Sequence, residues 1–168
     1  MATFSGGIKL SVVGTYTGSV DIGSVTQNLG YDATYTLTNG TGADQANMVF
    51  SDTRTLTASS SENLDLAGGL TDVFGTTITF TKIKGIIVKA AAANTNNVLV
   101  GGAASAQFVN WVSDATDVLV IRPGGMVALV APDATAYAVT ATTADLLKIA
   151  NSAGSTSVSY DIILIGTV

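Results

Sequence analysis

The sequence predicts an all-β domain, and three observations carry that prediction. Thr occurs 24 times and Val, Ile, Tyr and Phe are frequent, and these branched or aromatic side chains favour the pleated surface of a strand. Helix-forming patterns are nearly absent, since the chain has one glutamate, Glu62. The 18 Gly fall with Asn, Asp and Ser in short turn-like clusters. About eight short strands, spaced roughly ten residues apart, are expected in residues 51–168, which favours a β-sandwich or barrel.

The first 50 residues read as strands separated by Gly-rich breaks. Ile8–Val13 and Tyr31–Leu37 both alternate apolar and polar side chains, which is the pattern of a half-buried strand. Asn39-Gly40 marks a turn, and Ala46–Phe50 is a further short run. We therefore assign residues 1–50 to a looser segment of N-terminal strands or an arm.

Residues 51–168 are expected to form the compact part of the chain. Gly85 suggests a bulge, and Arg122–Gly125 suggests the tight turn of a hairpin because it combines Pro with two Gly. The stretch 145–150 is predicted as a strand or as one helical turn. The expected strands are Thr53–Thr57, Asn63–Leu66, Thr77–Ala90, Val98–Val100, Val118–Ile121, Met126–Val130, Ala136–Thr140 and Val158–Gly166.

The chain is unusually poor in charge. Charged residues make up 11% and hydrophobic residues 47%, whereas a typical soluble domain is about 25% charged. No apolar run reaches the roughly 18 to 20 residues that span a membrane, so no membrane association is expected, and no secretory signal is visible. The net charge of −5 argues against nucleic-acid binding. Such a surface is expected to be covered by copies of the chain or by a partner.

The absent residue types exclude several chemistries. Without His, neither Ser-His-Asp nor Cys-His catalysis is possible, and imidazole cannot ligate a metal. Without Cys there is no thiolate nucleophile, zinc-thiolate site, iron–sulfur cluster or disulfide. We expect no cofactor and no catalytic residue.

Asp114 and Asp117 are the closest acidic pair and the strongest candidates for chemistry. Paired carboxylates can act as acid and base or bind Ca²⁺. A calcium loop needs more oxygen ligands and a terminal glutamate, which this segment lacks. The alternative, which we favour, is a turn before a strand.

Two other groups of residues have structural and functional interpretations. Lys82, Lys84 and Lys89 are interpreted as a solvated face or as protection of a sheet edge rather than as a nucleic-acid site. The aromatic side chains are assigned to the core or to a contact between chains, with a ligand pocket as the alternative. They are Phe50, Phe74, Phe80, Phe108 and Trp111.

Several segments together resemble small structural proteins of tailed bacteriophages. The resemblance covers roughly residues 51–168 and rests on strand and turn patterns. The segments are Leu64-Asp-Leu66 with Gly68-Gly69, Asp72-Val-Phe74-Gly75, Ile83–Lys89, Val98–Ala103, Ile121–Gly125, Ala131-Pro-Asp133 and Tyr160–Ile165.

The resemblance implies a β-sandwich of jelly-roll type and a role in the virion. Proteins of this kind include capsid decoration or cement proteins, commonly homotrimers, that bind the major capsid protein on the phage head. The expected location is the head surface, after synthesis in the bacterial cytoplasm. The alternative is a tail or head fibre module that binds a host receptor or glycan through exposed Tyr16, Tyr31, Tyr35 and Trp111.

A contact surface between chains is also predicted. Its expected residues are Ile83, Ile86 and Val88, taken as the apolar outer face of a strand, together with Trp111; the N-terminal strands are the alternative location. A hydrolase that uses Asp114 and Asp117 is the enzymatic alternative.

Overall fold

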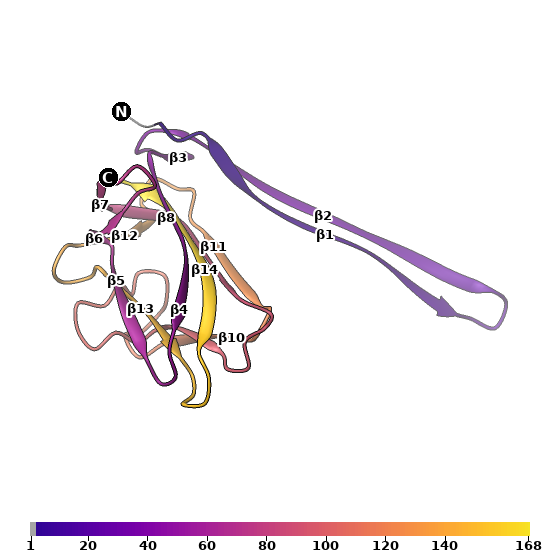
Figure 1. Ribbon diagram of the computed structural model, residues 1–168. Coiled ribbons are helices and arrows are strands. Elements are labelled where there is room, and N and C mark those ends of the chain that lie inside the picture. Colours follow the sequence, from indigo (N-terminus) through magenta and orange to yellow (C-terminus); the bar gives the residue numbers. More distant parts are fainter. Residues whose placement is uncertain (1–2) are drawn as a thin grey trace.

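The computed structural model describes residues 3–168 and consists of two parts (Figure 1). A body of two β-sheets contains most of the chain, and a long N-terminal β-hairpin projects from one end of it. The described residues contain no helix, so none could cross a membrane. The predicted all-β sandwich is confirmed.

The body is built from two antiparallel sheets that face each other. The larger sheet has the order β11 (Met126–Val130), β8 (Lys82–Ala90), β14 (Val158–Thr167) and β4 (Met48–Leu56), with the short β12 (Tyr137–Ala138) also paired to β8. The smaller sheet has the order β10 (Val118–Ile121), β9 (Val98–Gly101), β13 (Leu146–Asn151) and β5 (Ser61–Asp65). A separate small hairpin joins β6 (Ala67–Thr71) to β7 (Thr77–Thr79).

The strand pairs are nested, which defines the topology. The first of the eight main strands pairs with the last, β4 with β14, and the second with the seventh, β5 with β13. The third pairs with the sixth, β8 with β11, and the fourth with the fifth, β9 with β10. One long antiparallel ribbon rolled into two sheets has this order, which is that of a jelly roll.

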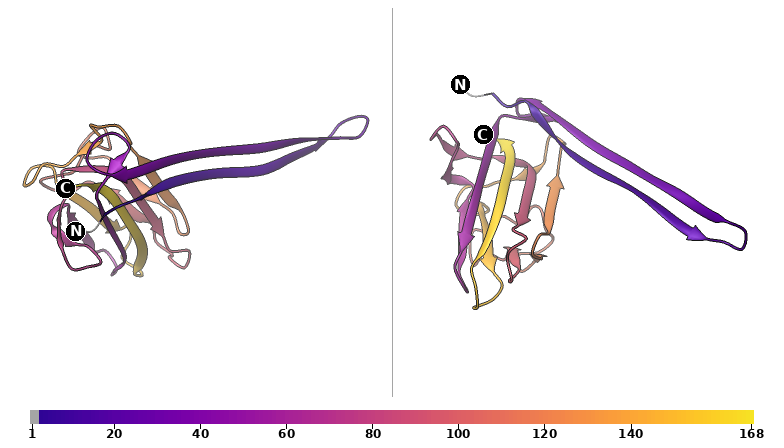
Figure 2. Two further views of the ribbon diagram at one scale, coloured as in Figure 1. Left: turned by 90° about the horizontal axis from the view of Figure 1, so that it is seen from above. Right: turned by 45° about the vertical axis from the view of Figure 1, so that its right-hand side comes forward.

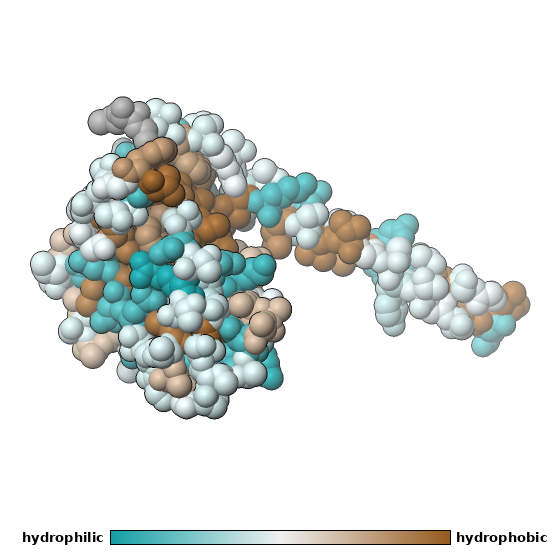
Figure 3. Space-filling model, in the orientation of Figure 1, coloured by the Kyte–Doolittle hydropathy of each residue, from teal (hydrophilic) through white to brown (hydrophobic). Residues whose placement is uncertain are grey.

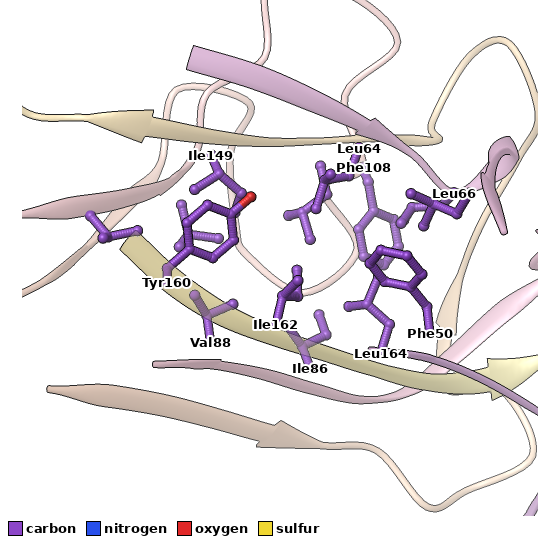
Figure 4. Close-up of a cluster of buried hydrophobic side chains, with 14 of the residues drawn as sticks. Phe50, Leu64, Leu66, Ile86, Val88, Phe108, Ile149, Tyr160, Ile162 and Leu164 are labelled. Carbon is purple, nitrogen blue, oxygen red and sulfur yellow. The ribbon is translucent and has the colours of Figure 1, made fainter. Parts of the chain in front are cut away.

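The core follows from the two-residue period of the strands. Alternate side chains of β14 point inward, and Tyr160, Ile162 and Leu164 are all 0–1% exposed. They meet Leu64 and Ile149 of the opposite sheet (Figure 4). Burial of each such side chain stabilises the fold by about 1.5–3 kcal/mol.

The turn at Arg122–Gly125 forms as predicted, but the hairpin does not. The Gly125 amide donates to the Arg122 carbonyl at 2.8 Å, and Gly124 has a φ of 74°. However, β10 pairs with β9 and β11 pairs with β8, so the turn links the two sheets. Local turn chemistry sets the direction of the chain, whereas the partner of β11 lies far away in sequence.

The predicted strand Thr77–Ala90 divides into β7 and β8, and its bulge lies one residue from the predicted position. Ile165 pairs with Gly85 while Gly166 pairs with Ile83, which leaves Lys84 as the extra residue. The stretch 145–150, for which the sequence allows either a strand or one helical turn, forms the strand β13.

Lys84 is fully buried beside this bulge and joins two loops. Its Nζ donates to the carbonyl of Gly42 at 3.0 Å and also to the carbonyl of Asp133. Burial lowers the pKa of Lys84, although the nearby Asp133 carboxylate acts in the opposite direction. The prediction that Lys82 and Lys84 form a solvated pair therefore fails for Lys84, because the bulge turns its ammonium toward main-chain carbonyls.

The N-terminal hairpin lies outside the sandwich. β1 (Gly6–Ser19) pairs with β2 (Ser24–Asn39) along its whole length, and the Val20 amide donates to the Gly23 carbonyl at the tip. A short strand, β3 (Gln45–Ala46), runs parallel to the end of β2. Two further views show the hairpin leading away from the body (Figure 2). The sandwich begins with β4 at Met48, so residue 50 lies inside its first strand.

We expect Lys84→Met to lower the free energy of unfolding by about 2 kcal/mol, because it leaves the carbonyl oxygens of Gly42 and Asp133 without the donor that Lys84 supplies. Lys82→Met is the matched control. Lys82 is half-buried and also donates to a carbonyl of this loop, that of Ala134, but this bond is exposed to solvent, so its loss should cost less than about 1 kcal/mol. Urea unfolding measures both, and equal losses would contradict this role of Lys84.

Candidate interaction surface

The β1–β2 hairpin, called the arm below, has one apolar and one polar face. Residues directly opposite in an antiparallel pair lie on the same face, so the register assigns every side chain. The apolar face holds Ile8, Leu10, Val12, Tyr16, Val25, Leu29, Tyr31, Ala33, Tyr35 and Leu37, with Gln27 opposite Tyr16 as its polar exception. The opposite face holds Thr, Ser and Asn, with Val13 as its apolar exception and a Lys9–Asp32 ion pair at 3.4 Å.

Most of the apolar face is open to solvent. Tyr16 is 79% exposed and Tyr31 56%, while Leu10 and Leu29 are both 52% exposed. The space-filling view shows brown, apolar patches where the arm meets the body, part-way along the arm and at its tip, with white and teal surface between them (Figure 3). Exposed apolar side chains gathered on one face mark an interaction site.

Only the base of the arm is packed against the body. Leu37 is fully buried with Ala46 and Ile165 in a small cluster, against which Ile8 packs. Gly85 lets this contact be close, because a Cβ there would lie 2.8 Å from Cδ1 of Ile8. The beginning of the arm is therefore fixed, and the rest of its length is free of the body.

An open cleft of about 470 Å³ lies where the arm leaves the body. The apolar face of the arm forms one wall, with Leu10, Tyr31 and Tyr35. The opposite wall is the outer face of the larger sheet, which contributes Ile87, Met126, Ala128 and Val130.

The outer face of the larger sheet carries an apolar row of its own. Ala128 pairs with Ile87, and Ile87 pairs with Ile163, so the three side chains lie side by side across β11, β8 and β14. Ala128 is exposed, Ile163 is 38% exposed and Ile87 is half-buried. Lys89 and Asp161 form the next row with Met126. We call Ile87, Ala128 and Ile163, together with Met126 from the next row, the outer row.

The structure corrects the contact residues predicted on β8. Ile83, Ile86 and Val88 are 0–1% exposed and belong to the core of a single chain, so they form no outer face. The alternation of the strand directs Ile87 outward instead. The bulge explains why Ile83 and Ile86 both point inward although they are three residues apart.

Trp111 lies in a loop and is half-buried against the core. Its Nε1 donates to the Phe108 carbonyl at 2.8 Å. That hydrogen bond lies within the chain, so a contact of Trp111 with another chain stays a prediction. The other three aromatic residues expected to bind a receptor or glycan, Tyr16, Tyr31 and Tyr35, are exposed and lie on the apolar face of the arm.

Asp114 and Asp117 come together as a turn. Asp117 accepts from the Asp114 amide at 2.8 Å, and Asp114 accepts from both the amide and the hydroxyl of Thr116. These bonds to Thr116 lower the pKa of Asp114. Both carboxylates are occupied by local backbone donors, which is the behaviour of turn-forming aspartates.

Glu62 links the two sheets at one edge of the sandwich. It lies on β5 and accepts from Arg54 of β4 at 2.5 Å and from the Tyr160 hydroxyl of β14 at 2.7 Å. Burial and the bond to Glu62 raise the pKa of Tyr160 far above its usual value. Burial opposes the charge of Arg54, but Glu62 outweighs it and the pKa of Arg54 is raised. The sequence carries no signal for this half-buried network, because Tyr160 lies 98 residues from Glu62 and Arg54 reaches it only across the two sheets.

A second apolar patch lies on the turn between β6 and β7. Asp72 accepts from the amides of Phe74 and Thr76. That turn leaves Val73 76% and Phe74 78% exposed, near Phe4 and Met48. This patch is smaller than the apolar face of the arm.

Within residues 3–168, no three His, Cys, Asp or Glu side chains are grouped so that they could hold a metal ion. No protein-family model, curated protein or solved structure gives a significant match to this chain.

Tyr160→Phe should change how stability depends on pH above 10. The unfolded tyrosine ionises near pH 10, whereas folded Tyr160 stays protonated because its pKa is raised. Its contribution is therefore fully present below pH 10 and is lost as the pH rises further, by up to about 1.4 kcal/mol per pH unit. Urea unfolding at several pH values should show a gentler loss for Tyr160→Phe than for the unaltered chain. Parallel curves would contradict the network, and Tyr16→Phe on the exposed arm is the control.

Removal of the distal arm should leave the body intact. We would delete residues 13–30 and join Val12 to Tyr31 through Asn-Gly, which forms a tight hairpin turn. The deleted residues pair only with each other, so in dilute solution the thermal midpoint should stay within about 2 °C. A larger fall, or loss of the β circular dichroism spectrum, would show that the distal arm supports the body.

Proposed function

We propose that this chain is a non-enzymatic structural protein of a virion, and that it acts as a capsid decoration or cement protein. The observation that carries the proposal is the arm, a long amphipathic β-ribbon held only at its base and open along its apolar face. A protein that stabilises a shell works by contact area, and such a surface provides that area.

Three further features support this role. The body has the jelly-roll strand order, which occurs in viral capsid and lectin domains among others, although a fold alone does not assign a function. The chain is 11% charged, so contact with another β-surface desolvates few charges. The resemblance of residues 51–168 to small structural proteins of tailed bacteriophages favours a phage head, with the major capsid protein and copies of the chain itself as partners.

A fibre module that binds a host receptor or glycan is the second candidate. It is favoured by the exposed tyrosines, of which Tyr31 and Tyr35 line the cleft at the base of the arm. Sugar recognition combines aromatic stacking with placed polar groups. The walls of this cleft are mainly apolar, with Lys9 as the one charged residue, so protein contact is the better explanation.

Quantitative mass spectrometry of particles purified from cells that carry this gene tests the proposal. We expect the chain to co-purify at a copy number close to that of the main shell protein. A few copies per particle, together with hits on a glycan array that Tyr31→Ala removes, would favour the fibre module. Absence from washed particles while the chain remains in the soluble lysate would contradict a virion role.

A further inference from the structure

We propose that the apolar face of the arm docks on the outer row of a second copy of this chain. The inference rests on the structural role proposed above and deepens it, because it names what covers the arm. The contact needs no shell, so it can be tested on the purified chain.

The same chain carries both halves of the contact. The apolar face of the arm holds no charged residue along β1 and β2. Ala128, Ile87 and Ile163 of the outer row supply an apolar strip across three strands that can receive part of this face. Within one chain the arm leads away from the body, so its distal part lies apart from the outer row (Figures 1 and 2). A neighbouring copy would bring an arm and an outer row together.

The available area agrees with a stable association. The part of the arm beyond its packed base, residues 10–19 paired with residues 24–33, is about 34 Å long at about 3.4 Å per residue and about 10 Å wide. One face of it then offers roughly 340 Å². In a reciprocal exchange each chain buries one arm face and the surface that receives its partner's arm, about 700 Å² per partner, which is close to the ~800 Å² of a standard interface.

Charge disfavours a lipid surface or a nucleic acid as the occupant. The arm contains three charged residues, of which Lys9 and Asp32 pair with each other on its polar face and Asp21 lies in the tip loop. Ribbons that lie on membranes carry Lys and Arg that contact anionic headgroups. The chain as a whole has a net charge of −5, which would repel both headgroups and phosphates.

The arm is also an unprotected β-edge. The outer edge of β1 is not paired with any described strand, and neither β1 nor β2 contains Pro. Natural monomers protect such edges with charges, Pro or bulges. A contact that buries the apolar face against another copy also restricts access to this free edge.

Light scattering after size exclusion tests the contact on the full chain at about 100 μM, where a standard interface of micromolar or tighter affinity would be occupied. We expect a mass at a multiple of 16.9 kDa. Leu29→Glu on the apolar face should weaken association by at least about 30-fold, because it places a charge in the contact. Asn28→Glu, the adjacent residue on the polar face, is its matched control and should leave association unchanged.

The outer row is tested in the same way. Ala128→Glu should dissociate the oligomer, whereas Asn63→Glu, on an exposed site of the smaller sheet, should not. All four positions are exposed, so circular dichroism and the thermal midpoint at low concentration should stay unchanged. A mixture of Leu29→Glu and Ala128→Glu chains should regain part of the association, since one chain keeps an intact outer row and the other an intact arm.

Several results would overturn the inference. The first is a chain that is monomeric at about 100 μM, and the second is an equal effect of Leu29→Glu and Asn28→Glu on association. The third is a mixture of Leu29→Glu and Ala128→Glu chains that regains no association. The last result would indicate contact between two arms. If the chain self-associates through the arm but is absent from particles, only the proposed virion role is contradicted. If the chain is abundant on particles but monomeric in solution, only the proposed contact between copies is contradicted.

Discussion

The uncovered apolar face of the arm is the constraint on which the account of this protein depends. The jelly roll closes its own core, with Tyr160, Ile162 and Leu164 fully enclosed between the two sheets. The arm has no such enclosure, because a two-stranded ribbon has a single layer and its apolar face finds no second one. The chain therefore divides into a body that is complete alone and an arm that needs a surface from elsewhere.

The connection between these two parts is short and well defined. Leu37 packs beneath the start of the arm, and Lys84 ties the loop that follows the arm to the carbonyl of Asp133 near β11. These contacts orient the arm at its base. Beyond Leu10 the ribbon depends on its own cross-strand pairs, so its order in solution should depend on whether a partner covers it.

Much of the fold could be predicted from the sequence, because the signals were local. Alternation predicted strands at Ile8–Val13 and Tyr31–Leu37, and turn residues predicted the break at Arg122–Gly125. Pairing was less accessible. The supposed hairpin after β10 joins two sheets, because strand partners in a jelly roll are set by nesting and not by neighbourhood in sequence.

The interaction surface was predicted only in part. The N-terminal strands were named as one possible contact region, and the apolar side of their alternation is the face that the structure exposes. Ile83, Ile86 and Val88 were assigned to the wrong side of β8, since a long apolar run does not show which face is inward and a bulge at Lys84 shifts the alternation. The link from Glu62 to Tyr160 joins residues 98 apart in sequence, and the link to Arg54 crosses from one sheet to the other, so neither had a local signal.

Amide hydrogen exchange of the arm at increasing protein concentration shows whether a second copy covers its apolar face. If a second copy covers the arm, amides in residues 10–33 should become protected as concentration rises, while those of β8 and β14 stay protected throughout. Fast exchange along the arm at every concentration, beside a protected body, would contradict the claim that this ribbon is a contact surface between copies of the chain.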